Sequence, residues 1–228
     1  MPAAPASLPL DHVDAWIFDL DNTLYPPEAD IFAQIDERMG RFIADLLDCD
    51  RVEARRIQKD YFHTHGTTLS GLMTHHKVAP HDFLDFVHDV DLTVLDADPL
   101  LVAAIAGLPG RKFIFTNGDA PYAVRVLDRL GLGQSFEAIH DIHACGYAPK
   151  PTLSAYHGMI DSFGIDPARS LFVEDMARNL KPAKALGMTT VWINNGSERG
   201  AHEADPDFID IEITDLGQWL GSIQRRTS

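Results

Sequence analysis

Three short apolar runs, far apart in the chain, each end abruptly in a cluster of polar residues. In chain order these junctions read AWIF-DLDNT (residues 15–23), FIF-TNGD (113–119) and LFV-ED (171–175). Uninterrupted apolar runs of this length are typical of strands that are buried on both faces of a parallel sheet. Ligands of open α/β sheets bind beyond the carboxyl ends of the strands, so the three clusters are expected to share one site.

The rest of the chain alternates apolar runs with amphipathic helical segments, which predicts an α/β fold built from βα units around a parallel sheet. Strands are expected over residues 15–20, 112–116, 138–142, 170–173 and 189–193. Helices are expected over residues 99–108, 121–130, 152–163 and 177–186, several with proline in the first turn, and the tail should end in an amphipathic helix.

The alternation stops between residues 25 and 95, where the pattern is helical throughout. Helices are expected over residues 31–47, 51–65, 69–77 and 81–90. A helical insertion placed after the first strand cannot join the sheet, so residues 25–95 should form a cap over a core of residues 1–24 and 96–228. Phe62, Phe83 and Phe86 are expected to belong to the core of this cap.

Composition narrows the classes of partner. The 228 residues include 34 acidic and 19 basic ones, a net charge of -15, which disfavours binding to nucleic acid. Cys49 and Cys145 form no CxxC-type motif, so metal-thiolate and redox chemistry are not expected. The first residues lack a positively charged and apolar signal, and no stretch has the roughly 18 apolar residues of a membrane span. We therefore expect a cytoplasmic protein without membrane contact. The expected oligomeric state is a monomer or a homodimer, and the composition does not choose between the two.

The first polar cluster carries the strongest chemical signal. Asp19 and Asp21 are two residues apart where a buried strand ends, so their carboxylates can face one small volume. Like charges this close usually require a cation or different protonation states. A simple turn made by Asx side chains is the alternative for this segment alone.

Three further elements suit phosphate chemistry. Thr116 and Asn117 offer a hydroxyl and backbone N–H groups before a helix, although a turn with an N-cap is the alternative there. Lys150 lies between two prolines, which restrict where its ammonium can go. Glu174 and Asp175 again deliver carboxylates to a strand end. Oxygen-only ligands favour a hard cation such as Mg²⁺.

The order Asp-x-Asp-x-Thr, Thr-Asn, Lys-Pro and Glu-Asp resembles the haloacid dehalogenase-like hydrolase superfamily over residues 16–194. The resemblance implies a Rossmann-like core with an all-helical cap after the first strand. The cap sequence YFHTHG (residues 61–66), followed by Gly71-Leu72 and by HKV (76–78), is similar to the pyrimidine 5′-nucleotidase branch.

The same resemblance implies a Mg²⁺-dependent phosphomonoester hydrolase and a role for each matching residue. Asp19 would be the nucleophile that forms an aspartyl-phosphate, and Asp21 the general acid and base. Thr116 and the backbone of Asn117 would bind phosphoryl oxygens, and Lys150 would neutralise charge. Thr23 would orient the first loop. The implied metal ligands are the Asp19 carboxylate, the Asp21 carbonyl, Asp175 and, directly or through water, Glu174.

The resemblance also implies a small phosphorylated metabolite as substrate, with a nucleoside 5′-monophosphate such as UMP or CMP as the specific expectation. A phosphatase or phosphomutase acting on a sugar phosphate or pyridoxal phosphate is the alternative. A catalytically silent binding protein on the same fold is another. A dehalogenase has no use for a carboxylate at Asp21, and a two-component receiver domain places its acidic pair and its phosphoacceptor in the reverse order.

Overall fold

The computed structural model describes residues 10–227; residues 1–9, which include the segment tested above for a targeting signal, and Ser228 lie outside the described residues. Six strands form one parallel sheet in the order β3-β2-β1-β4-β5-β6. Their bounds are Ala15–Phe18 (β1), Arg111–Phe115 (β2), Ala138–His140 (β3), Ser170–Glu174 (β4), Thr189–Ile193 (β5) and Ile211–Ile213 (β6). The expected α/β class with a parallel, Rossmann-like sheet is confirmed.

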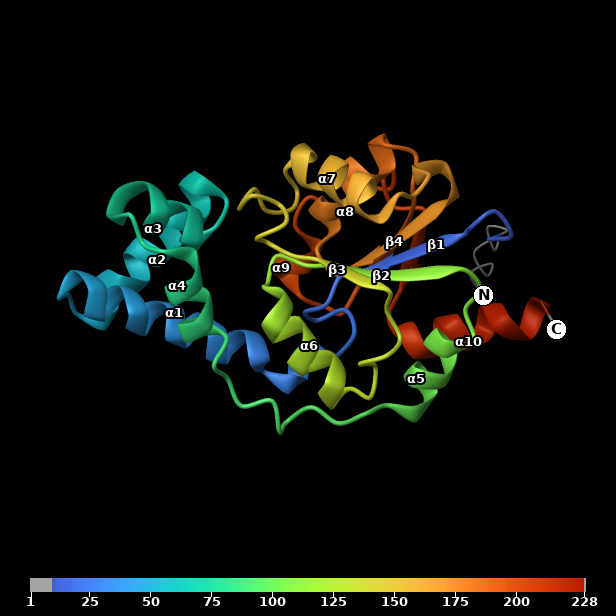
Figure 1. Ribbon diagram of the computed structural model, residues 1–228, viewed down its shortest axis with the longest axis horizontal. Coiled ribbons are helices and arrows are strands. Elements are labelled where there is room, and N and C mark those ends of the chain that lie inside the picture. The colour runs from blue at the N-terminus through green and yellow to red at the C-terminus, as the bar shows by residue number, and fades with distance from the viewer. Residues whose placement is uncertain (1–9, 228) are drawn as a thin grey trace.

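Helices cover both faces of the sheet (Figure 1). One face carries α5 (Pro99–Ala106), α6 (Ala120–Arg129) and α10 (Leu216–Thr227), and the other carries α7 (Leu153–Phe163) and α8 (Ala177–Ala185). The short helices are η1 (Pro27–Ala29), η2 (Pro167–Arg169) and α9 (Glu198–Ala201). The helix starts follow the sequence: Asp119, for example, accepts a hydrogen bond from Tyr122 N at the start of α6.

Burial on both faces explains why β1 is apolar without interruption. Trp16 and Phe18 pack into the core layer beneath α5, α6 and α10, and Ile17 packs into the layer beneath α7 and α8. All four residues of β1 are buried. The apolar run ends where the buried strand ends, and the next residue after β1 is Asp19.

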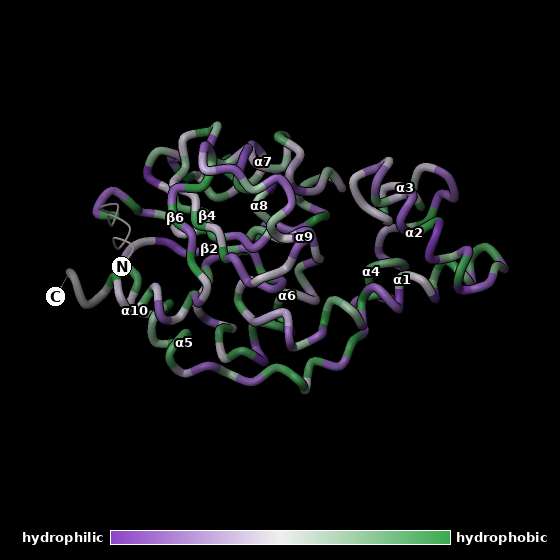
Figure 2. Tube along the Cα trace, turned by 180° about the vertical axis from the view of Figure 1, so that it is seen from behind, coloured by the Kyte–Doolittle hydropathy of each residue, from purple (hydrophilic) through white to green (hydrophobic). Residues whose placement is uncertain are grey.

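Four helices are inserted between β1 and β2: α1 (Ile31–Leu47), α2 (Arg51–His65), α3 (Thr68–His76) and α4 (Pro80–Val87). They pack on one another, α1 against α2 and α4, and α2 against α3. Figures 1 and 2, seen from opposite sides, both show this group beside the sheet and not within it. Residues 88–98 return to the core as a segment without helix or strand. We call the four helices the cap; its exact limits at residues 25 and 95 stay a prediction.

The structure differs from the expectations mainly at the ends of elements. β1 stops at Phe18 and not at residue 20, because the chain turns at Asp19 into the polar loop. The three-residue strand β6 and the one-turn helix α9 were not expected, since neither is long enough to show a period. Among residues 10–227, no helix combines the length and the apolar character that a membrane crossing needs.

Candidate active site

The carboxyl ends of three adjacent strands bring most of the predicted site residues together. β1 lies between β2 and β4, so the strand order reverses at β1, which is where sheets of this kind bind ligands. Asp19 follows β1, Thr116 follows β2, and Glu174 ends β4 with Asp175 next in the chain. The three polar clusters of the sequence therefore meet at one edge of the sheet.

Lys150 reaches the same place from the loop that follows β3. Its Nζ donates to Asp19 Oδ1 at 2.6 Å, to Glu174 Oε2 at 2.8 Å and to the Phe115 carbonyl at 2.9 Å. The side chain is 1% exposed. Burial by itself lowers the pKa of Lys150, but the charges of Asp19 and Glu174 outweigh it and hold the pKa above its usual value. Lys150 is thus a fixed positive charge beside Asp19.

Asn117 holds the lysine loop in place. Its Nδ2 donates to the Lys150 carbonyl at 3.3 Å, and Lys150 N donates to Asn117 Oδ1 at 2.8 Å. The neighbouring Thr116 is fully buried, and its Oγ1 accepts from Gly118 N at 2.9 Å. The Asn117 side chain positions Lys150, which leaves the backbone of Asn117 for the phosphate contact expected from the sequence.

Asp19, Glu174 and Asp175 form an acidic cluster. Each offers a carboxylate oxygen within 4.8 Å of the others, all three residues are buried, and residues 10–227 contain no second group of this kind. Burial raises the pKa of Asp19 to about 7 and that of Asp175 to about 10; the Glu174 charge adds to both shifts, and Lys150 opposes them. One ammonium cannot balance three carboxylates. A hard divalent cation with oxygen ligands can, so this donor set fits Mg²⁺.

The first loop is shaped so that the side chain of Thr23 reaches Asp19. Asn22 takes the left-handed conformation at φ 57°, which asparagine tolerates better than most residues. Thr23, 5% exposed, donates from Oγ1 to Asp19 Oδ2 at 3.1 Å. Both oxygens of Asp19 therefore have a side-chain donor, Lys150 on one and Thr23 on the other. This geometry supports the expected orienting role of Thr23.

Asp21 has two partners that the sequence did not reveal. The phenols of Tyr25 and Tyr122 donate to its Oδ1 at 2.5 and 2.7 Å. Burial, followed by the charge of Asp21, raises the pKa of both phenols, so both remain protonated donors. Tyr25 stands four residues after Asp21 and could have been noticed. Tyr122 lies 101 residues away, and no pattern in the sequence marks it.

The cap meets the core at Phe62, and here one expectation was wrong. Phe83 is 1% exposed and Phe86 packs against the cap interior, as expected. Phe62 is only half-buried, and the guanidinium carbons of Arg178 and Arg199 lie 5.5 and 4.9 Å from its ring centre. Both arginines belong to the core. Apolar spacing along α2 cannot distinguish a ring inside the cap from one that contacts another part of the chain.

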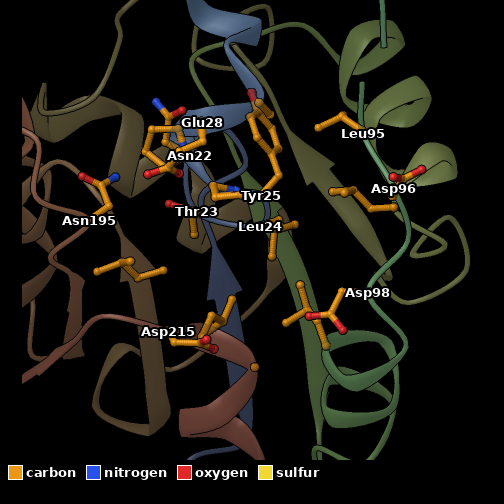
Figure 3. A pocket seen from close by; sticks show the side chains of 18 of the residues that line it. Asn22, Thr23, Leu24, Tyr25, Glu28, Leu95, Asp96, Asp98, Asn195 and Asp215 are labelled. Atoms are coloured by element: carbon orange, nitrogen blue, oxygen red, sulfur yellow. The ribbon is translucent and has the colours of Figure 1, made fainter. Parts of the chain in front are cut away.

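A cavity of about 620 Å³ lies beside the first loop (Figure 3). Its wall includes Asn22, Tyr25, Thr23 and Asn195, whereas Asp19 and its acidic neighbours do not line it. Thr23 donates to Asp19, and Asn195 Nδ2 lies 3.5 Å from an oxygen of the Asp175 carboxylate. Two residues that line the cavity therefore contact residues of the acidic cluster.

The raised pKa values predict how metal-free protein responds to pH. A carboxyl whose folded pKa is raised stabilises the fold while it is protonated, and this contribution is lost as pH rises through the folded pKa. For Asp19 the loss runs from about pH 4 to about pH 7, and for Asp175 it continues toward about pH 10. We expect the melting temperature in EDTA to fall between pH 5 and pH 8, and Mg²⁺ to raise it more at pH 8 than at pH 5.

The matched control for this experiment is Asp175→Asn, which cannot lose a proton at that position. Its melting temperature in EDTA should depend less on pH than that of the wild type. Equal Mg²⁺ stabilisation of the wild type at pH 5 and pH 8 would contradict the assignment of raised carboxyl pKa values to the metal-free site.

Comparison with known proteins agrees with this geometry. The family profile of haloacid dehalogenase-like hydrolases matches residues 13–187. Phosphate metabolism protein 8 of Saccharomyces cerevisiae is 25% identical over 196 residues, which are 76% of this chain and 59% of the yeast protein. The chain thus spans less than two thirds of the yeast protein's length. Glyceraldehyde 3-phosphate phosphatase of Methanocaldococcus jannaschii is 25% identical over 222 residues, 91% of this chain and 96% of that protein.

Phosphoglycolate phosphatase of Escherichia coli K12 is 30% identical over 130 residues, 55% of this chain and 49% of that enzyme. Among solved structures, a phosphatase of this family from Thermococcus onnurineus superposes with a TM-score of 0.64 at 20% identity, covering 95% of this chain and 98% of that one. An L-2-haloacid dehalogenase from Xanthobacter autotrophicus superposes with a TM-score of 0.56 at 16% identity, covering 93% of this chain and 98% of the dehalogenase. Phosphatases and dehalogenases therefore share this fold. From its matching profile and the arrangement of its strand-end residues, this chain belongs to the haloacid dehalogenase-like hydrolases.

Proposed function

We propose that the chain hydrolyses phosphomonoesters of small metabolites by attack of Asp19 on phosphorus. The observation that carries the proposal is that Asp19 shares one buried cluster with Glu174 and Asp175 and bonds to Lys150, with a second carboxylate, Asp21, two residues on. A dehalogenase needs only the first of these carboxylates. Named phosphatases among the relatives support the same choice.

In the first step, a carboxylate oxygen of Asp19 attacks phosphorus and the bond to the ester oxygen breaks. Asp21 gives its proton to the departing oxygen, which leaves as an alcohol. The product is an aspartyl-phosphate on Asp19. Lys150 offsets negative charge beside the phosphoryl group, and Thr116 with the backbone of Asn117 binds its oxygens.

In the second step, Asp21 takes a proton from a water molecule that attacks phosphorus, and the bond to Asp19 breaks. Inorganic phosphate leaves and both carboxyl groups return to their starting state. Mg²⁺, held by Asp19, the Asp21 carbonyl, Asp175 and Glu174, would supply the charge that lets a phosphate dianion approach the acidic cluster. The side chains supply positioning and electrostatics, which dominate phosphoryl transfer.

Removal of the cation should stop turnover. Phosphatases of this family generally use Mg²⁺, and the acidic cluster has no other charge sufficient to admit an anionic substrate. We expect EDTA to abolish phosphate release from p-nitrophenyl phosphate and Mg²⁺ to restore it, with Ca²⁺ as a control for simple charge. Full activity in excess chelator would contradict the proposed metal-dependent mechanism.

For the substrate, we propose a nucleoside 5′-monophosphate, preferentially UMP or CMP. The support is the resemblance of cap residues 61–78 to the pyrimidine 5′-nucleotidase branch. The named relatives point to a wider class, since they act on glyceraldehyde 3-phosphate and phosphoglycolate. Phosphate release should be compared across nucleotides, sugar phosphates, pyridoxal phosphate and phosphoglycolate. A rank of UMP and CMP below the sugar phosphates would refute the nucleotide assignment and leave the hydrolase assignment in place.

A phosphomutase would use every residue named above and differ only in the acceptor of the phosphoryl group. Release of one inorganic phosphate per ester consumed supports the hydrolase. Transfer to a second sugar without release would favour the mutase. Failure to turn over any phosphoester in the panel, including an activated aryl phosphate, would favour a binding protein on the same fold.

A further inference from the structure

The carboxylate proposed as general acid is held by two buried phenols. Tyr25 Oη lies 2.5 Å and Tyr122 Oη 2.7 Å from the same oxygen, Oδ1 of Asp21. The phenol oxygens are 3.3 Å apart, and the two tyrosines are 3% and 0% exposed. One tyrosine precedes the cap in the chain and the other begins α6, so Asp21 is fixed from two directions. Figure 3 shows Tyr25 beside the residues of the first loop.

Because both phenols donate to the same oxygen of Asp21, they decide which oxygen of that carboxyl can carry a transferable proton. Two hydrogen bonds occupy both lone pairs of Oδ1, so a proton on that oxygen would have to displace a phenol. The second oxygen, Oδ2, makes no such bond with either phenol. An acid catalyst works only when its proton lies within reach of the leaving oxygen, so selecting one carboxyl oxygen also selects the direction of transfer.

The ring of Tyr122 is itself held by the segment that leaves the cap. His88, 6% exposed, stacks on Tyr122 with ring centres 4.4 Å apart and planes 15° apart. His88 Nδ1 lies 3.0 Å from Asp119 Oδ1, and Arg125 donates to the His88 carbonyl at 2.5 Å. A ring that stacks on a histidine held by both Asp119 and Arg125 has little freedom to turn.

We propose that Tyr25 and Tyr122 are positioning residues: they bind Oδ1 of Asp21 so that Oδ2 carries the proton to the leaving oxygen and later takes it from water. The proposal rests on the hydrolase function proposed above. The alternative is a purely structural role, in which each buried phenol hydroxyl donates to Asp21 only because it needs a hydrogen-bond acceptor, as buried tyrosines usually do. The positioning role and the structural role predict different effects of a phenylalanine substitution on kcat/KM for substrates with different leaving groups.

The test compares leaving groups. An alkoxide needs a proton to depart, whereas 4-nitrophenolate departs readily without one. The value of kcat/KM reports the steps up to loss of the leaving group. For the best alkyl monoester of the panel, Tyr25→Phe and Tyr122→Phe should each lower kcat/KM about 10-fold or more. For p-nitrophenyl phosphate, each should lower kcat/KM less than about 3-fold. Tyr147→Phe, which removes a phenol bonded to His143 and not to Asp21, is the control and should change neither.

Asp21→Asn provides the reference and separates the two proposals. If Asp21→Asn slows the alkyl ester far more than the aryl ester, Asp21 is the general acid, and Tyr→Phe variants added to it should then have little further effect on the alkyl ester. If Asp21→Asn slows both esters equally, the general-acid role within the proposed function fails.

If Asp21→Asn shows the expected difference but the tyrosine variants lower both esters equally, or neither, the positioning proposal fails while the function stands. A cooperative thermal transition near that of the wild type shows that each variant is folded. Tyr25 lies in the first loop and Tyr122 in α6, so either variant alone tests the proposal.

Discussion

Asp19→Asn is expected to lower kcat for phosphoester hydrolysis by at least about a thousand-fold, because an amide oxygen cannot form the covalent intermediate that divides the reaction into two steps. The substitution keeps the size of the side chain and one acceptor oxygen, which can still accept from Lys150, while the amide nitrogen replaces the oxygen that accepts from Thr23. It also removes one of three crowded carboxylates. The variant should therefore fold, and steady-state phosphate release measures the loss.

Asp45→Asn, on the exposed face of α1, removes the same kind of charge far from the strand ends and should leave kcat unchanged. A thermal unfolding transition like that of the wild type would show that the Asp19 variant is intact. An intact Asp19→Asn protein with wild-type turnover would rule out Asp19 as the nucleophile.

Lys150→Met is expected to have the largest effect on stability and to abolish most activity. It leaves two buried carboxylates, those of Asp19 and Glu174, without the ammonium that contacts both. Removing one partner of a buried ion pair typically costs about 3–5 kcal/mol. Denaturant unfolding of the metal-free protein measures this loss. The loss should be smaller at pH 5 than at pH 8, because burial raises the pKa of Asp19 to about 7 and protonation of Asp19 below that pH removes one of the uncompensated charges.

Lys184→Met is the matched control. Lys184 pairs with Asp210, but its side chain is 38% exposed, and exposed pairs contribute at most about 1 kcal/mol. If the two methionine variants were destabilised equally, or if Lys150→Met were destabilised more at pH 5, the described charge balance of the site would be wrong.

The parts of the fold that the sequence predicted are those with a strong local signal. A strand buried on both faces must be apolar throughout, so β1, β2 and β4 could be recognised, and the polar residues that end them mark the site edge. Among the cap helices, α1 shows the 3.6-residue period over several turns. The three-residue β6 shows no period at all, and its pairing with β5 depends on residues distant in the chain.

The parts of the site that the sequence did not predict depend on contacts between distant segments. Nothing near Tyr122 indicates that its hydroxyl meets Asp21, and nothing near Asn117 indicates that its side chain holds the lysine loop. Phe62 illustrates the same limit: a helical pattern shows that a side chain is apolar but does not show which surface it contacts. The sequence pattern identified the charged residues of the site. The neutral residues that hydrogen-bond to them could be identified only from the folded structure.

The most direct test of the account is to trap the covalent intermediate. A single turnover of Mg²⁺-loaded protein with a reactive monoester, quenched in acid within milliseconds and digested, should give one phosphorylated peptide that contains Asp19, and the same peptide from Asp19→Asn should carry no phosphate. Rapid turnover with no phosphoryl group on the chain, or with the group on another residue, would contradict the proposed chemistry.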